Sequence, residues 1–297
     1  AAARLNHITR AAEEVHLTQP AVSIQIRKLE DTVGTALLEL IGRRIHLTEA
    51  GQEVYAAARD ILQRLGELEL SLDELKDEVT GPINLVVVSS AKYFLPYLLS
   101  HFLEHYPAVT PRLIVTNRAK LLGRLAANED HLYIMGQVPE GIPVEEYPFL
   151  ENVLVVVARP DHPLTGQDDI PLSDIAGQRV ISRESGSGTR KAIENLFRQN
   201  DLEISPYMEL GGTDEIKHAV MAGLGIAVLP LYSLGLELSA NKLAVLKVQQ
   251  FPLRRRWYAV HRRGKKLSKP AQLFLDYLQY EGEQQIEQLL SGTELSP

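Results

Sequence analysis

Cysteine is absent from the 297-residue chain, which excludes disulfides and thiolate-bound metal ions. Long apolar runs are also missing, and the stretch Val153–Ala158 is far too short to span a bilayer. The opening residues lack the basic segment, apolar core and cleavage site of a signal peptide. They start inside a helical pattern without a methionine, so we expect part of a first helix to be missing. These absences predict a cytoplasmic protein with no membrane partner.

The length allows two or three domains, each with a full-sized hydrophobic core. Hydrophobic residues make up 45% and charged residues 23% of the chain, which is ordinary for a globular protein. The net charge of −7 argues against indiscriminate nucleic-acid binding, but it leaves room for a local basic surface.

Residues 9–33 have the pattern of two short helices joined by a tight connection. Thr9 begins the first helix, Thr18 is suited to cap the second, and Pro20 is tolerated in the second helix's first turn. Apolar residues then recur at spacings of four, three and four, which predicts one buried stripe: Val22, Ile26, Leu29 and Val33. Two such helices form a helix-turn-helix.

The opposite face of the second helix carries side chains suited to DNA. Gln19 can bond adenine bidentately, and Thr18 and Ser23 can reach phosphate or base. Exposed Ile24 can pack against a thymine methyl group, and Arg27 is placed for a phosphate. An ordinary helical hairpin with a solvated charged face has the same periodicity, so the pattern alone leaves both interpretations open.

Residues 41–51, IGRRIHLTEAG, predict a hairpin with a basic tip and then a helix capped by Thr48. The tip carries Arg43 and Arg44. A basic hairpin after a helix-turn-helix makes the N-terminal domain, residues 1–51, a winged helix-turn-helix with double-stranded DNA as its partner.

A heptad pattern occupies Gln52–Val79, which contains no proline. Its apolar positions alternate spacings of four and three: Val54, Ala58, Ile61, Leu65, Leu68, Leu72, Leu75 and Val79. We expect residues 52–80 to form a long coiled-coil linker helix that holds two DNA-binding domains in a homodimer. The alternative is a long helix packed on its own domain.

Residues 81–297 alternate strand-like and helical segments, which predicts α/β layers with largely parallel sheets. The expected strands are Asn84–Ser90, Arg112–Asn117, Leu132–Met135, Val153–Ala158, Arg179–Ser182, Ile226–Leu229 and Trp257–His261. The expected helices include Lys92–His105, Gly188–Gln199, Asp214–Ala222 and Pro270–Gln284. We expect two lobes, residues 83–158 with 262–284 and residues 159–261, with crossings at Ala158–Pro163 and near Tyr258–Arg262. A polar tail, Ser291–Pro297, follows.

Ligands of open α/β sheets bind beyond the carboxyl ends of strands, where helices begin. One such junction offers Ser89, Ser90 and Lys92, and SRESGSGTR offers a second set of hydroxyls, glycines and cations. Further strand ends supply Gly136, Gln137 and Thr213. The second set is Arg183, Ser185, Gly188, Thr189 and Arg190. Each junction is also compatible with an ordinary βα turn, but together they predict a small anionic ligand such as a phosphate ester.

The segment RAAEEVHLTQPAVSIQIRKLED, with LLELIGRRIHLTEAG after it, closely resembles the N-terminal domain of LysR-type transcriptional regulators. The resemblance implies that Thr18, Gln19, Pro20, Ser23 and Arg27 face DNA, with Arg43 or Arg44 in the wing. It also implies a two-lobed effector-binding domain like type 2 periplasmic binding proteins and dimers that pair into homotetramers. Ile24 departs from the family, in which this position is often basic.

The C-terminal segments SSAKYFLPYLL, ENVLVVVARPDHPL, SRESGSGTR and FPLRRRWYAVHRRGKKLS resemble the LysR-type branch that controls carbon-fixation operons. That resemblance implies regulation of RuBisCO and inorganic-carbon uptake genes. It implies as effectors ribulose-1,5-bisphosphate, 2-phosphoglycolate or related phosphorylated metabolites, or NADPH, and no other cofactor.

Three other functions compete with this prediction. An enzyme is disfavoured because SGSGT lacks the G-x-S-x-G elbow and HFLEH lacks the HExxH zinc arrangement. A solute-binding protein would share the two-lobed architecture but would not need a helix-turn-helix. A constitutive DNA-binding scaffold without an effector is the third, and it would not need two cationic helix starts at one cleft. Within the LysR-type family, a regulator of another pathway that responds to a non-phosphorylated organic acid remains the alternative. We expect a ligand-responsive transcription regulator, with no catalytic residues and no metal site.

Overall fold

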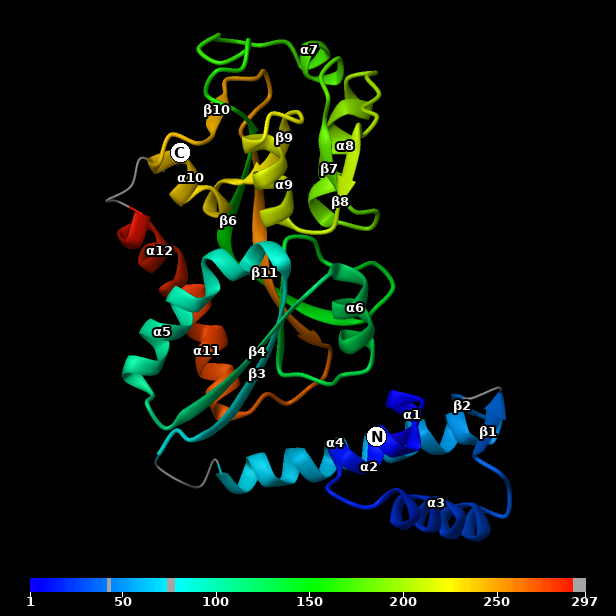
Figure 1. Cartoon of the computed structure of the whole chain (residues 1–297). Coiled ribbons are helices and arrows are strands. Elements are labelled where there is room, and N and C mark those ends of the chain that lie inside the picture. Colours follow the sequence, from blue (N-terminus) through cyan, green and yellow to red (C-terminus); the bar gives the residue numbers. More distant parts are fainter. Residues whose placement is uncertain (42–43, 74–77, 291–297) are drawn as a thin grey trace. The chain divides into compact units, whose positions relative to one another are not determined.

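The computed structural model describes residues 1–41, 44–73 and 78–290 (Figure 1). Its internal contacts divide the chain into two units, Ala1–Leu75 and Lys76–Pro297, which are described in turn. Arg43, Leu75 and the tail Ser291–Pro297 lie outside the described residues. No helix among the described residues is long and apolar enough to cross a membrane.

The N-terminal unit contains the expected helices and hairpin. Its elements are α1 (Ala2–Leu5), α2 (Ile8–Glu14), α3 (Gln19–Val33), β1 (Leu38–Ile41), β2 (Arg44–Leu47) and α4 (Glu49–Asp73). Thr18 caps α3 by accepting from the Ala21 amide, and Gly34 ends it with φ +81°. The Thr48 hydroxyl accepts from the Gly51 amide at 3.0 Å and donates to the Ala36 carbonyl at 2.8 Å. Thr48 therefore starts α4 and also ties it to the connection before β1.

The predicted buried stripe of α3 is only partly present. Val22 is buried, whereas Leu29 is 46% and Val33 43% exposed. Among the described residues, α3 packs chiefly against α2, whose Ala11 and Ala12 are buried. The second half of the stripe is therefore a surface of this unit, and the prediction of a fully buried stripe is wrong.

The long helix α4 ends before the predicted heptad seam does. Residues 78–80 are not helical, and Val79 packs against the core of the second unit. The heptad pattern predicted Val79 as the last position of the seam, and this prediction is wrong. Ile61 is 61% and Leu65 52% exposed in the chain taken alone.

The second unit contains two lobes joined by two long strands, β6 and β11 (Figure 1). The first-lobe elements are β3 (Gly81–Val88), the 3-10 turn η1 (Ser89–Tyr93), α5 (Leu95–His105), β4 (Val109–Thr116), α6 (Arg118–Ala126), β5 (Leu132–Met135), α11 (Lys269–Tyr280) and α12 (Gly282–Leu290). The second-lobe elements are α7 (Leu172–Ala176), β7 (Ile181–Arg183), α8 (Gly188–Gln199), β8 (Met208–Leu210), α9 (Thr213–Met221), β9 (Ala227–Pro230), η2 (Leu231–Ser233), α10 (Gly235–Ser239) and β10 (Ala244–Leu246). The joining strands are β6 (Val144–Ala158) and β11 (Leu253–Arg262).

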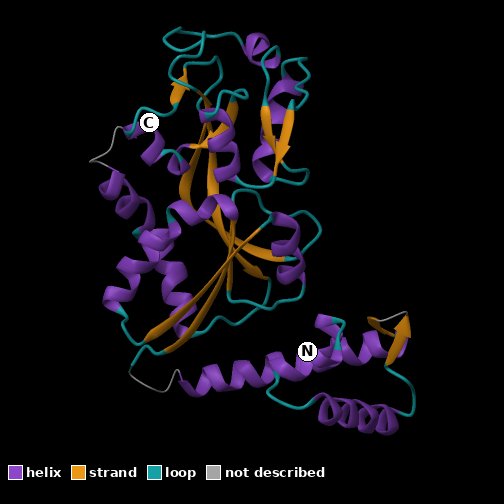
Figure 2. Cartoon of the chain, viewed as in Figure 1, coloured by secondary structure: helices purple, strands orange, loops and turns teal. Residues whose placement is uncertain are grey.

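One seven-stranded sheet runs through both lobes in the order β10-β6-β11-β5-β3-β4, with β9 also paired to β6 (Figure 2). β3 is parallel to β4 and β5, whereas every pair that involves β6 or β11 is antiparallel. The prediction of largely parallel sheets is therefore confirmed only in part: β7 and β8 form a separate parallel sheet in the second lobe, but the seven-stranded sheet is mixed. A chain that enters the second lobe along β6 and returns along the adjacent β11 must make these two strands antiparallel.

Alternate strand residues face opposite helical layers in each lobe. In the first lobe, Ile83, Leu85 and Val87 of β3 pack with α5, α11 and α12, whereas Val86 packs with α6. In the second lobe, even-numbered β6 residues pack with α7 and α8, and odd-numbered ones pack with α9. The sheet is thereby covered by helices on both faces.

The joining strands cross between the lobes earlier than predicted. Leu150 belongs to the first-lobe core and Val153 to the second-lobe core, which places the outward crossing at residues 151–152. Leu253 packs against the second-lobe core and Trp257 lies in the first, which places the return at residues 254–256. Side chains at these crossings can therefore line the space between the lobes.

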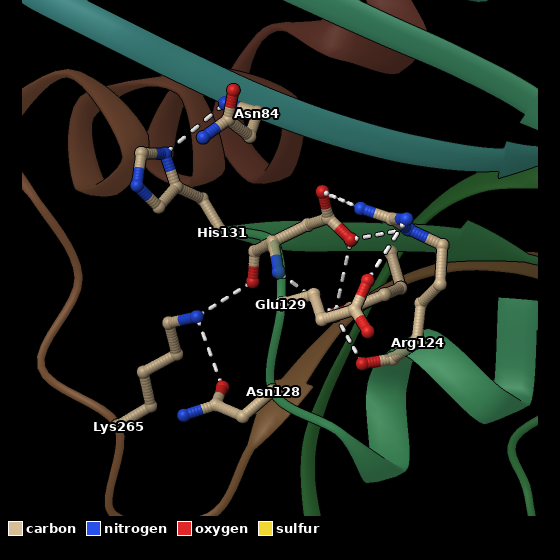
Figure 3. A network of polar contacts seen from close by, with 8 residues as sticks. Asn84, Arg124, Asn128, Glu129, His131 and Lys265 are labelled. Atoms are coloured by element: carbon tan, nitrogen blue, oxygen red, sulfur yellow. Dashed lines mark hydrogen bonds and ion pairs between the residues drawn. The ribbon is translucent and has the colours of Figure 1, made fainter. Parts of the chain in front are cut away.

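A buried polar network fixes the start of β5 in the first lobe (Figure 3). The Asp130 carboxylate accepts two hydrogen bonds from Arg124, both 2.8 Å long. The backbone carbonyl of Asp130 accepts another from Lys265 Nζ at 2.6 Å. Next to it, His131 Nδ1 accepts from the Asn84 amide at 3.1 Å. Burial lowers the pKa of His131 to about 4, which keeps Nδ1 unprotonated as this acceptor role requires.

Candidate functional site

The N-terminal unit presents the predicted DNA-contacting residues at the start of α3. Gln19, Pro20, Ile24 and Arg27 are exposed, and Ser23 is half-buried. Gln19 Nε2 donates to Ser23 Oγ at 2.9 Å, so these two polar side chains lie together on one helix face. Thr18 is exposed at the cap, Thr9 is exposed on α2, and Arg44 begins β2.

An inner cavity lies between the two lobes of the second unit. Its volume is about 30 Å³, which is room for one or two water molecules. Several predicted ligand residues line it together: Ser89, Ser90, Gly136, Gln137, Arg183, Gly188 and Thr189. The cavity continues into an outer groove of about 750 Å³ that is lined by, among others, Ser185 and Arg190.

The start of α8 forms one wall of the inner cavity. Ser187 is the residue before the helix, Gly188 and Thr189 are its first residues, and Ser187 and Thr189 are buried. Backbone N–H groups in a first helical turn have no intrahelical partner, and the helix dipole favours an anion there. From the opposite lobe, η1 brings Ser89 and Ser90 to the same cavity, which makes this a suitable anion site.

The three cations predicted for the ligand are all neutralised by carboxylates. Arg183 donates to Glu184 at 2.7 and 2.9 Å, and its Nη2 also donates to Ser89 Oγ at 3.1 Å. Arg190 pairs with Glu194 and Glu209. Lys92 pairs with Asp214, and neither Lys92 nor Thr213 lines the cavity or the groove.

Sequence reasoning missed several residues that line the inner cavity, among them Asn117, Arg118, Asn152, Arg255 and Trp257. Asn117 caps α6 by accepting from the Lys120 amide at 3.0 Å, and Arg118 is the first residue of that helix. The junction of β4 with α6 is thus another turn from a strand into a helix, the kind of position at which a ligand site was predicted for Ser89. It was missed because the sequence analysis did not predict α6. Asn152 and Arg255 lie at the strand crossings, which the sequence placed elsewhere, and Trp257 follows the return crossing by one residue.

The two parts of the chain match two family models. Residues 1–52 match "Bacterial regulatory helix-turn-helix protein, lysR family", and residues 76–283 match "LysR substrate binding domain". The chain belongs to the LysR family. It is a DNA-binding transcription regulator rather than an enzyme, and the N-terminal match disfavours a solute-binding protein.

Relatives along the whole chain come from the carbon-fixation branch of LysR-type regulators. The transcriptional activator CmpR of Synechocystis is 44% identical over 94% of this chain and 91% of its own. The RuBisCO operon transcriptional regulator of Allochromatium vinosum is 44% identical over 94% of this chain and 92% of its own. CbbR of Rhodospirillum rubrum is 38% identical over 94% of this chain and 92% of its own.

Solved structures agree with this family. The regulatory domain of Synechocystis CcmR in complex with 2-PG (2-phosphoglycolate) is 43% identical, has a TM-score of 0.65, and covers 67% of this chain and 96% of that chain. A full-length OxyR variant from Pseudomonas aeruginosa has a TM-score of 0.74 at 20% identity and covers 93% of this chain and 90% of that chain. The latter likeness shows the shared fold alone.

Proposed function

We propose that this regulator controls carbon-fixation genes in response to a small phosphorylated acid bound between the two lobes. The observation that carries the proposal is the inner cavity, where Ser89 and Ser90 face the start of α8. Hydroxyls and unpaired backbone N–H groups are the donors that a phosphate ester accepts from. The CcmR regulatory domain, solved with 2-phosphoglycolate, supports this ligand class.

The proposed DNA contacts follow from the exposed start of α3. In a helix-turn-helix, N-terminal side chains of the second helix reach base edges in the major groove. Gln19 would read adenine, Ser23 and Thr18 would reach base or phosphate, and Arg27 would bind a phosphate. The wing residues Arg43 and Arg44, together with Pro20, Ile24 and Thr9, complete the proposed surface.

The proposed assembly is a homodimer through α4, with dimers paired into a homotetramer. Exposed Ile61 and Leu65 lie four residues apart on the predicted seam, and two such helices would bury them against each other. A dimer with two helix-turn-helix units matches a DNA site with two half-sites.

The proposed response to the effector is a change in the relation between the lobes. The inner cavity of about 30 Å³ continues into the groove of about 750 Å³, and Arg183 of the second lobe donates to Ser89 of the first beside it, so a ligand that enters from the groove would compete with this contact between the lobes. An effector shifts an equilibrium only through different affinities for its two states. Different lobe spacings with and without ligand would alter how dimers pair on DNA.

Isothermal titration calorimetry of the whole chain tests the ligand class. We expect 2-phosphoglycolate to bind and glycolate, which lacks the phosphate, to bind at least about tenfold more weakly, because charge-assisted hydrogen bonds contribute about 1.5–3 kcal/mol each. Ser90→Ala removes a cavity hydroxyl and is expected to weaken the phosphorylated ligand only. Equal affinity for glycolate would favour the alternative, a regulator that responds to a non-phosphorylated organic acid.

A further inference from the structure

Cations are concentrated in one stretch of an otherwise acidic chain. Between Glu237 and Asp276 lie 38 consecutive residues that contain ten lysines and arginines but neither aspartate nor glutamate. The rest of the chain carries 21 lysines and arginines against 38 acidic residues. Solvated protein surfaces ordinarily mix charges of both signs, so a long stretch with one sign directs attention to a polyanionic partner.

The ten cations of this stretch separate into three groups in the folded chain. Lys242 and Lys247 lie in the second lobe, and residues 254–256, all arginine, lie at the return crossing between the lobes. The other five extend from the last residue of β11 to the first residue of α11: Arg262, Arg263, Lys265, Lys266 and Lys269. We call these five residues the basic loop.

The basic loop lies at the end of the first lobe where β3 begins, and hence where the chain arrives from the N-terminal unit (Figure 1). β11 is antiparallel to β5, and β5 is parallel to β3, so β11 ends where the other two strands start. Lys265 accordingly reaches the Asp130 carbonyl just before β5, at 2.6 Å (Figure 3). Beside it, His131 accepts from the amide of Asn84, which is three residues after Gly81, about 10 Å along an extended strand.

The two arginines of the basic loop donate to backbone carbonyls rather than to carboxylates. Arg262 Nη1 donates to the Ala126 carbonyl at 2.7 Å, and Arg263 Nη2 to the Val144 carbonyl at 3.5 Å. Neither forms an ion pair within the described residues. Glu145 beside the loop has a lowered pKa chiefly because it accepts from a loop amide at 3.1 Å, and the charge of Arg263 contributes less. A guanidinium has five N–H donors, so both arginines keep donors for a phosphate.

Arg112 in β4 extends this surface across the sheet. It is exposed, and it makes no hydrogen bond or ion pair in the part of the chain that the structure describes. The strand registers place Arg112 level with Asn84 in β3 and with Arg262 in β11, on the face that α6 covers. Three strand spacings, about 14 Å, separate β4 from β11. This separation is close to the width of the DNA major groove, about 12 Å, which phosphates border on both sides.

We propose that the basic loop and Arg112 bind the phosphate backbone of double-stranded DNA that flanks the site contacted by the helix-turn-helix. DNA held by the N-terminal unit is tethered to this surface, which gives the flanking phosphates a high effective concentration there. Arginine contacts to phosphate carry no sequence information, which suits DNA outside the specific site. The surface is separate from the effector cleft, because the cleft lies at the opposite, carboxyl ends of β3 and β4.

Fluorescence anisotropy with two duplexes tests this surface in the full chain. One duplex is a carbon-fixation promoter site trimmed to its two half-sites, and the other is the same site with flanking DNA on each side. The double variant Arg112→Gln, Arg263→Gln should bind the long duplex about 10- to 50-fold more weakly at about 0.1 M salt. Its salt dependence there should fall by about 2 in the log–log slope, since each phosphate contact contributes about 0.9. The trimmed duplex should bind as it does to the wild type.

Two further variants separate the role of this surface from that of total charge. Lys242→Gln with Lys247→Gln removes the same charge from the same acid-free stretch, but in the second lobe, and should bind both duplexes like the wild type. Arg112→Lys with Arg263→Lys keeps the charge and should retain most of the affinity for the long duplex. Unchanged thermal unfolding checks that each variant is folded.

Three results would overturn the proposed surface. The first is a glutamine double variant that binds the long duplex like the wild type. The second is an equal loss on both duplexes, and the third is an equal loss in the second-lobe control. Calorimetry with 2-phosphoglycolate keeps this test distinct from that of the proposed function: the glutamine double variant should bind the ligand like the wild type, and a wild type that binds no ligand leaves the DNA result unaffected.

Discussion

Asp214 in the second lobe accepts a hydrogen bond from Lys92 in the first lobe, with 2.5 Å between Oδ2 and Nζ. The Tyr93 hydroxyl also donates to this carboxylate, and Lys217 Nζ lies 3.3 Å from Oδ1. Burial alone would raise the pKa of Asp214, but these three donors outweigh it and lower the pKa to about 2. The group of Lys92, Tyr93, Asp214 and Lys217, which we call the lobe latch, holds the lobes together beside the effector cavity.

Asp214→Asn should weaken the lobe latch. Asp214 is partly exposed, so after allowance for solvent screening we expect a loss of about 1 kcal/mol in the free energy of unfolding at neutral pH. The ligand should also bind faster, because the lobes separate more easily. Chemical denaturation and stopped-flow binding measure the two effects. Asp168→Asn, in the exposed pair with Lys247, is the control, and an equal effect there would contradict the latch.

His131 should make stability depend on pH between about 6.5 and 4. The pKa of His131 is about 4 in the folded chain and 6.5 in the unfolded chain. Its contribution to the free energy of unfolding is therefore fully present above pH 6.5. Between these two pH values His131 is protonated in the unfolded state but neutral in the folded state. The free energy of unfolding therefore decreases by about 2–3 kcal/mol as the pH falls to 4.

His131→Asn keeps an acceptor for the Asn84 amide but removes this titration. Urea unfolding from pH 7 to pH 4 should therefore give a shallower pH dependence for the variant than for the wild type. Identical slopes would show that His131 does not remain neutral on folding.

Gln19→Ala should reduce the preference for specific over random DNA by about 1–3 kcal/mol, because a bidentate base contact is lost. Arg27→Ala should weaken binding to both kinds of DNA and reduce the salt dependence, because a phosphate contact carries no sequence information. Fluorescence anisotropy with both DNAs at several salt concentrations separates the two roles. Equal losses on both DNAs for Gln19→Ala would refute base reading.

Ile61→Asp should dissociate the dimer, because it places a charge on the predicted seam of α4. Ala56→Asp adds the same charge to an exposed position on the opposite face and should leave the dimer intact. Sedimentation analysis distinguishes these results. A dimer that survives Ile61→Asp would show that α4 is not the dimer contact.

The sequence predicted most elements because their patterns are local. The helix start at Gly188 follows from a run of glycines and hydroxyls, and the cap at Thr18 follows from its own side chain. The antiparallel pairing of β6 with β11 depends on residues a hundred positions apart, which no local pattern records. The partner of Lys92 is equally remote, so a residue expected to bind the ligand belongs to the lobe latch. Arg255 was missed because the sequence does not show that its neighbours Arg254 and Arg256 pair with glutamates whereas Arg255 lines the cavity.

The central claim is that a phosphorylated effector in the cleft changes the complex of this regulator with DNA. The most direct measurement is the DNA bend angle on promoter DNA from a carbon-fixation operon, obtained by energy transfer with and without saturating 2-phosphoglycolate. We predict a changed bend at unchanged occupancy, and loss of that change in Arg255→Gln at the same ligand concentration. A bend angle that saturating effector leaves unaltered in the wild type would contradict the account.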